Sequence, residues 1–183
     1  MKEFSTKNNF CVFLTQADDL GRVVIPKEIR RTLRIREGDP LEIYTDRDGE
    51  VIFKKYSPIG SLTDFASQYA ETLAKISGNA ACITDKDTII AVGGAPKRDL
   101  YEKRLSSEIE NIMEEKTTFV TESDIPITEG SKYNAGVIVP IIAEGDSIGN
   151  VIIMKGDGEK TSSEIDTKLA QSAALFFGKQ MEI

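Results

Sequence analysis

The sequence of 183 residues contains no histidine and no tryptophan. Without histidine, the chain cannot use imidazole as a general acid or base, activate a nucleophile with it, or hold a metal through it. The two cysteines, Cys11 and Cys82, form no Cys-x-x-Cys motif, which excludes a zinc cluster or redox motif of the usual spacing. One long-range disulfide stays open as an alternative. The expectation is a reduced cytoplasmic protein, since no secretory signal is recognisable.

Long apolar segments and nucleotide-binding loops are also absent. The longest run without a polar residue covers residues 135–143, whereas a helix that crosses a bilayer needs about 20 residues. The Gly-Gly-Ala-Pro segment at residues 93–96 follows an expected strand and is broken by proline, so we interpret it as a turn. No buried carboxylate pair is recognisable. We therefore expect no catalytic residue, no metal site, no cofactor, no enzymatic activity and no membrane association.

Charge is unevenly distributed along the chain. The net charge is −7, but residues 1–56 carry 11 basic and 10 acidic residues, whereas residues 57–183 carry 12 basic and 20 acidic ones. Within the first part, residues 22–36 hold six cations and a single acid, Glu28. They form a local positive patch in an acidic protein. Charge alone favours the simpler interpretation of a solvated helix face.

Residues 1–56 are expected to form a small β-rich unit. Apolar runs between turn signals predict four short strands, at residues 11–14, 22–25, 41–45 and 50–55. Their apolar residues fall on both faces, and a chain of about 55 residues buries only about 60% of its surface. A second copy of the unit is the simplest cover for both faces, which predicts an obligate homodimer with interleaved strands.

A helix is predicted at residues 26–33, opened by a proline whose missing N–H is not needed at the first helical position. Ile29 and Leu33 share one face of this helix at i, i+4 spacing. The cations predicted on or near the opposite face are Lys27, Arg30, Arg31 and Arg34. A cationic face backed by an apolar stripe is expected of a docked helix whose outer side meets an anion.

Residues 57–183 are expected to form an α+β domain with an antiparallel sheet and flanking helices. The predicted helices cover residues 61–76, 97–116 and 162–181. The predicted strands cover residues 80–84, 88–92, 117–121, 136–143 and 147–155. A polar loop is predicted at residues 122–134, a Ser-x-x-Asp cap at Ser163 and Asp166 opens the last helix, and Cys82 is expected to be a core residue.

The segment at residues 18–33, Asp-Asp-Leu-Gly-Arg-Val-Val-Ile-Pro-Lys-Glu-Ile-Arg-Arg-Thr-Leu, resembles the AbrB-type swapped-hairpin DNA-binding domain. The resemblance continues through residues 36–44 to residues 54–56. The whole chain resembles the stage V sporulation protein T family. This implies a GAF-type domain at residues 57–183, interlocked N-terminal dimers, dimers joined as a homotetramer through the GAF helices, and transcriptional activation and repression late in spore development.

The resemblance also implies which residues contact DNA. The DNA-contacting arginines of the family fall on Arg22, Arg30 and Arg31, and the helix projection places Lys27 and Arg34 nearby. Each guanidinium can bond a phosphate bidentately or reach the O6/N7 edge of guanine. With about eight phosphate contacts per dimer, a plot of the logarithm of the binding constant against the logarithm of the salt concentration would have a slope near −7.

Thr15 and Gln16 depart from the pattern, because the family usually carries two basic residues there. Two alternatives to a DNA-binding regulator stay open. One is an antitoxin-like module that binds a partner protein, although such modules usually carry a disordered acidic tail where residues 57–183 indicate a folded domain. The other is a sensor with weak DNA binding, whose GAF-type domain holds a small-molecule effector beneath a lid at residues 122–134. A dimerisation scaffold with a filled core is equally compatible with that domain.

Overall fold

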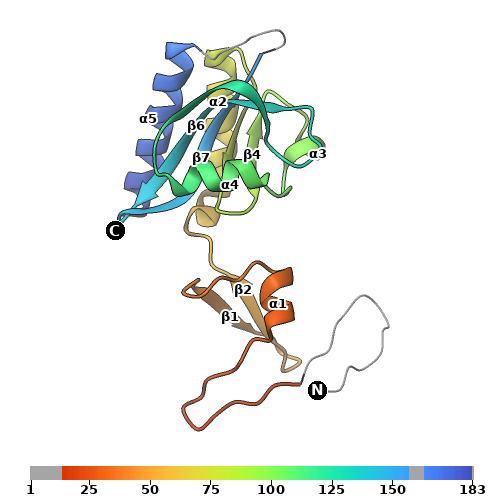
Figure 1. The fold of residues 1–183 in the computed structure, drawn as a ribbon. Coiled ribbons are helices and arrows are strands. Elements are labelled where there is room, and N and C mark those ends of the chain that lie inside the picture. The colour runs from red at the N-terminus through yellow and green to blue at the C-terminus, as the bar shows by residue number, and fades with distance from the viewer. Residues whose placement is uncertain (1–13, 157–162, 183) are drawn as a thin grey trace. The chain divides into compact units, whose positions relative to one another are not determined.

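The computed structural model describes residues 14–156 and 163–182 of the chain. It divides into two compact units, Met1–Tyr56 and Ser57–Ile183 (Figure 1). Cys11 and most of the strand predicted at residues 11–14 lie outside the described residues.

The described part of the first unit contains one short helix and one hairpin. The helix is α1 (Lys27–Thr32), and the hairpin is an antiparallel pair of β1 (Leu41–Thr45) and β2 (Val51–Lys55). The Asp-Gly turn predicts this hairpin, and Gly49 supplies the positive φ of +85° that the turn requires. Pro26 is the N-cap of α1 rather than its first residue, so the helix is shorter than predicted.

The strand predicted at residues 22–25 is not formed within the described part of one chain. An isolated antiparallel bridge between Ala17 and Val23 is what remains of it. Backbone N–H and C=O groups of a strand need a neighbouring strand to pair with. Residues 15–17 lie beside this segment, but among the described residues of a single copy they make no more than this one bridge with it, so no ladder forms.

The described part of the first unit has no core of its own. No described residue from Leu14 to Tyr56 is buried, and the side chains of Val24 and Ile43 are 71% and 64% exposed. Exposed apolar residues lie on both faces of the hairpin, because Ile43 faces the side opposite to its neighbour Tyr44. A lone two-stranded hairpin is marginally stable in water, so these faces require a cover.

The second unit is built on a five-stranded antiparallel sheet in the order β4-β3-β7-β6-β5. Its strands are β3 (Ala81–Thr84), β4 (Ile89–Gly93), β5 (Phe119–Pro126), β6 (Asn134–Ala143) and β7 (Asp146–Met154). The inner strands are buried along nearly their whole length. The prediction of an antiparallel α+β domain is confirmed.

Helices cover both faces of this sheet (Figure 1). A 3-10 turn η1 (Pro58–Leu62) leads into α2 (Thr63–Ser77), which packs with α5 (Glu164–Met181) on one face. On the other face lie α3 (Lys97–Leu100) and α4 (Ser107–Glu114). The predicted cap is present as a capping box, in which Ser163 and Asp166 each accept a backbone N–H of the other.

The prediction of one helix over residues 97–116 is wrong. The chain leaves helical geometry after α3, and Glu102 takes a positive φ of +59°. Its N–H donates to the carbonyl of Ile89 at the edge of the sheet. The sheet edge offers backbone partners that replace the helical ones, and both Leu100 and Leu105 become buried. The helix restarts behind Ser106, whose hydroxyl caps α4.

Candidate nucleic-acid interface

The helix α1 carries three of the predicted cations. The side chains of Lys27, Arg30 and Arg31 are exposed, while Ile29 on the other side of the helix is half-buried. Among the described residues, none of these three side chains makes a hydrogen bond or an ion pair. No carboxylate of the described chain therefore competes with an external anion for these side chains.

Arg34 lies differently from the cations of α1. The helix ends at Thr32, and Arg34 follows it with a left-handed φ of +50°. The residue is half-buried and already has partners within the chain. A helical projection from residues 26–33 therefore does not describe its place, because the helix ends before it.

A half-buried ion pair fixes the end of α1 against the hairpin. Nζ of Lys55 lies 3.1 Å from Oδ2 of Asp39 and donates to the carbonyl of Arg34 at 3.2 Å. The same Oδ2 accepts the N–H of Arg36 at 2.8 Å. The pair ties β2 to the loop that follows the basic helix. The predicted site does not include it, because residues 39 and 55 are distant in sequence.

Arg22 leaves a tight turn that Asp18 organises. Oδ1 of Asp18 accepts the N–H of Leu20 at 3.0 Å and that of Arg22 at 2.8 Å, while Oδ2 accepts Nε of Arg22 at 2.7 Å. Gly21 supplies the positive φ of +75° that this turn needs. The N–H and the guanidinium of Arg22 hold the pKa of the Asp18 carboxyl below its usual range.

Thr15 and Gln16, which replace two basic residues of the family pattern, are exposed beside this turn. The hydroxyl of Thr15 donates to the carbonyl of Val24 at 2.9 Å. Both line an open groove with apolar members, among them Leu14 and Val24. These residues offer no positive charge to an anion.

In the second unit, residues 122–134 are not the free polar loop that the sequence predicts. The first five of them belong to β5, which pairs with β6 and carries a bulge between Val120 and Ile125. Ile127 and Thr128, which follow the strand, are buried. A lid over residues 122–134 is therefore wrong for the first part of the segment, because an edge strand holds it to the sheet.

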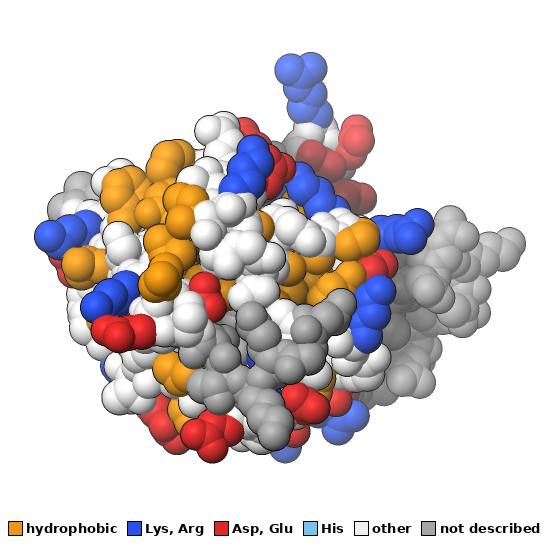
Figure 2. Space-filling view, turned by 90° about the horizontal axis from the view of Figure 1, so that it is seen from above, with side chains coloured by type: hydrophobic (Ala, Val, Ile, Leu, Met, Phe, Trp, Pro, Cys, Tyr) orange, Lys and Arg blue, Asp and Glu red, His pale blue; other side chains and the backbone are white. Residues whose placement is uncertain are grey.

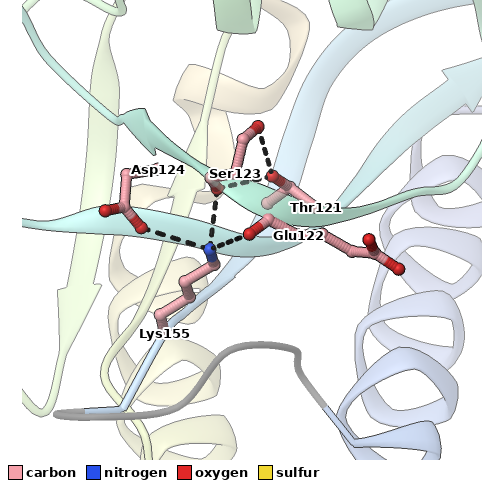
Figure 3. A network of polar contacts seen from close by, with 5 residues as sticks. All are labelled: Thr121, Glu122, Ser123, Asp124 and Lys155. Carbon is pink, nitrogen blue, oxygen red and sulfur yellow. Dashed lines mark hydrogen bonds and ion pairs between the residues drawn. The ribbon is translucent and has the colours of Figure 1, made fainter.

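Lys155 fastens this bulged strand (Figure 3). Its side chain is 7% exposed, and Nζ donates to the carbonyls of Glu122 at 3.2 Å and Ser123 at 2.7 Å. Asp124 supplies a carboxylate oxygen at 3.2 Å. The hydroxyl of Thr121 donates to the same Ser123 carbonyl. The bulge thus exposes backbone oxygens that one ammonium group satisfies.

We expect Lys155→Met to lower the free energy of unfolding by about 1–2 kcal/mol, because it removes the charge-assisted hydrogen bonds that the Nζ of Lys155 makes to the carbonyls of Glu122 and Ser123. Urea denaturation followed by circular dichroism measures the change. Lys168→Met is the control, since Lys168 makes only an exposed pair with Glu164, worth less than about 0.5 kcal/mol. Equal losses in the two variants would contradict a fastening role for Lys155.

The space between the sheet and α4 is filled by apolar side chains. The fully buried members of this cluster include Cys82, Leu105, Ile109, Ile138 and Ile152. Cys82 is a free thiol, and burial raises its pKa to about 12, so the prediction of a core cysteine is confirmed. This packing favours the scaffold alternative over a ligand pocket on this face.

The surface seen from above carries both signs of charge (Figure 2). Lysine and arginine side chains are interspersed with aspartate and glutamate, and hydrophobic side chains gather in patches between them. Among the residues that the structure describes, no group of three or more Cys, Asp or Glu could hold a metal ion. No helix in the same described part is long and apolar enough to span a bilayer.

The two units together define a class: a small helix-and-hairpin unit that carries a basic helix, followed by an α+β domain with a five-stranded antiparallel sheet. The family described as "Stage V sporulation protein T C-terminal, transcription factor" matches residues 61–182. Stage V sporulation protein T of Bacillus subtilis (strain 168) is 50% identical over 170 residues, which cover 90% of this chain and 94% of the relative. The chain therefore belongs to the stage V sporulation protein T family, a family of transcription factors.

Further comparisons concern each unit separately. The family described as "Antidote-toxin recognition MazE, bacterial antitoxin" matches residues 14–61. Transition state regulatory protein AbrB of Bacillus subtilis (strain 168) is 63% identical over 43 residues, 24% of this chain and 44% of the relative. The GAF domain of a Coxiella burnetii phosphoenolpyruvate-protein phosphotransferase is 16% identical with a TM-score of 0.53, covering 66% of this chain and 82% of that one. The predicted family, the AbrB-type and GAF-like fold, and the role of sporulation transcription regulator are confirmed.

Proposed function

We propose that the chain binds duplex DNA as a homodimer, through Arg22, Lys27, Arg30 and Arg31 of each first unit, with Arg34 at the margin. The observation that carries this proposal is that α1 presents three exposed cations without partners in an otherwise acidic chain. A dimer doubles the set about a two-fold axis, which matches the symmetry of duplex DNA. This assigns the DNA-binding role to residues 1–56 and the regulatory and oligomerising role to residues 57–183.

A footprint on genomic DNA at physiological salt tests this function. The full chain is expected to protect paired half-sites related by a two-fold axis, with dissociation constants in the range of about 10⁻⁸ to 10⁻¹¹ M. Binding no tighter than about 10⁻⁴ M to every fragment would overturn the proposal.

The dimer follows from the exposed apolar faces of the first unit. The described residues 14–56 form no buried core within one copy, and Leu14, Val24 and Ile43 leave apolar side chains exposed for a second copy to cover. Interleaving two copies would supply a strand neighbour for residues 22–25, which among the described residues make a single bridge. We therefore infer that a second copy completes the unit.

The second unit offers a separate apolar surface on α2 and α5. Phe65 and Phe176 stack across the two helices with ring centroids 5.5 Å apart, yet both stay partly exposed, as does Leu175. Ile76 and Ile165 add exposed apolar area on the same helices. We infer that this surface pairs between subunits and joins two dimers as a homotetramer.

Leu175→Asp is expected to halve the molar mass of the full chain in light scattering, because a charge in a packed helix contact lacks a partner. Lys179→Asp is the control at an exposed charged position of the same helix, and the tetramer should survive it. A tetramer that persists in Leu175→Asp would contradict pairing through this surface.

The family of transcription factors supports the proposal that the chain is not an enzyme. A free methionine-R-sulfoxide reductase of Thermoplasma acidophilum shares the fold of the second unit, with 13% identity and a TM-score of 0.52, over 66% of this chain and 94% of that one. The fold alone therefore decides nothing about catalysis. The single cysteine of this unit, Cys82, has its thiol buried and its pKa raised, which makes it inert as a nucleophile at neutral pH. We also propose that the protein acts in the cytoplasm, where its partners are duplex DNA and further copies of the same chain.

A further inference from the structure

The carboxylate of Asp18 binds both the backbone N–H and the guanidinium of Arg22. Oδ1 of Asp18 binds the N–H of Arg22, and Oδ2 binds its Nε at 2.7 Å. The turn is closed from the other direction as well, because the N–H of Asp18 donates to the carbonyl of Arg22 at 3.0 Å. Backbone and guanidinium of this arginine are therefore fixed by the same side chain.

The contact leaves the outer part of the guanidinium unused. Among the described residues, Asp18 is the only ion-pair partner of Arg22, and the side chain of Arg22 stays 72% exposed. Nη1 and Nη2 keep their N–H donors, which form the fork that matches O6 and N7 of guanine. An arginine held in advance loses less rotamer freedom on binding than a mobile one.

The pair is poorly suited to bind phosphate through charge. A carboxylate at salt-bridge distance offsets the positive charge of Arg22, so the pair contributes little to the counterion release that drives phosphate binding. Arg30 and Arg31 on α1 have no such partner among the described residues. The two kinds of arginine therefore differ in their environment before DNA arrives.

We propose that Asp18 is a positioning residue that presents Arg22 to a guanine edge, so that Arg22 discriminates between sequences while Arg30 and Arg31 supply phosphate contacts. This inference rests on the proposed DNA binding. It adds that base recognition and phosphate binding are carried out by different arginines of the DNA-binding surface. The lowered pKa of Asp18 agrees with it, because the carboxylate stays ionised wherever the protein meets DNA.

The test compares Asp18→Asn with Asp19→Asn in the full chain. Both remove one negative charge, but Asp19 is exposed and makes no hydrogen bond or ion pair with Arg22 among the described residues. Two probes are used: the duplex protected in the footprint and the same duplex with its sequence shuffled. Asp18→Asn is expected to lower the ratio of the two affinities by about 10-fold or more, whereas Asp19→Asn raises both affinities alike and keeps the ratio.

Asparagine keeps Oδ1 as an acceptor for the turn, so the backbone of residues 18–22 has its bonds in both variants. A double-mutant cycle excludes a collapsed turn as the cause: in an Arg22→Gln background, Asp18→Asn should leave the ratio unchanged. Equal gains for both duplexes in Asp18→Asn would overturn the positioning role and leave Asp18 as a repelling charge. A wild-type chain that binds neither duplex overturns DNA binding itself, together with this inference.

Discussion

Reversing Arg30 and Arg31 to Glu should abolish DNA binding while the oligomer stays intact. A dimer loses four guanidinium groups in this variant, and at about 1 kcal/mol for each contact the affinity falls by about 10³-fold before repulsion is added. Both side chains are exposed on α1 and make no hydrogen bond or ion pair within the described chain. Fluorescence anisotropy with a labelled promoter duplex measures the loss, and light scattering checks the molar mass.

The matched control reverses Lys97 and Arg98 to Glu. It changes the net charge of the chain by the same amount, at two exposed positions of α3 in the second unit. At about 0.1 M salt, binding should weaken by less than about 10-fold, because repulsion between the added carboxylates and the DNA phosphates is largely screened beyond about 10 Å. Equal losses in the two double variants would show that total charge, rather than the surface of α1, governs binding.

Ile43→Asp should unfold the first unit and remove DNA binding with it. In one isolated copy the side chain of Ile43 is 64% exposed, and substitution at such a position is normally neutral within about 0.5 kcal/mol. If a second copy covers this face, the carboxylate is buried without a partner and costs about 3 kcal/mol or more. The two accounts therefore predict opposite results for the same substitution.

Limited proteolysis and circular dichroism distinguish these results. We expect residues 14–56 to become protease-sensitive in Ile43→Asp, while the fragment from residue 57 onward stays resistant. Ile43→Val is the control, because it keeps an apolar side chain of nearly the same volume and should behave as wild type. An unchanged melting curve and dimer for Ile43→Asp would contradict the interleaved pair.

Features that depend on neighbouring residues could be predicted from the sequence. The Asp-Gly hairpin turn and the cap at Ser163 and Asp166 are examples, because a few adjacent side chains determine each of them. The exposed cations of α1 also follow from helical spacing, since the helix forms nearly where it is expected. The apolar residues on both faces of the hairpin indicated an incomplete unit for the same local reason.

Features that depend on distant residues could not be predicted in this way. The segment after Leu100 has helical spacing, but the edge of β4 offers its backbone other partners. The strand character of residues 122–126 depends on pairing with β6, and the role of Lys155 depends on a bulge in β5 that no local pattern marks. The pairing of Lys55 with Asp39 joins residues 16 positions apart.

The contact between Asp18 and Arg22 lies between these cases. The spacing of four residues with Gly21 between them is a local signal for a turn that brings the two side chains together. The charges in the sequence alone make Arg22 one of six equivalent cations in residues 22–36. The geometry instead shows that it already has a carboxylate partner, unlike Lys27 and the arginines of α1.

The salt dependence of DNA binding tests the central claim most directly, since each phosphate contact releases counterions and adds about 0.9 to the slope of log K against log salt. The comparison is between the wild-type chain and Arg30→Gln with Arg31→Gln, which removes four cations from a dimer. If the exposed cations of α1 hold the phosphates, the slope of the variant will be shallower by about 4. Identical slopes for the two proteins would contradict the account, because Arg30 and Arg31 would then not contact the phosphates of the duplex.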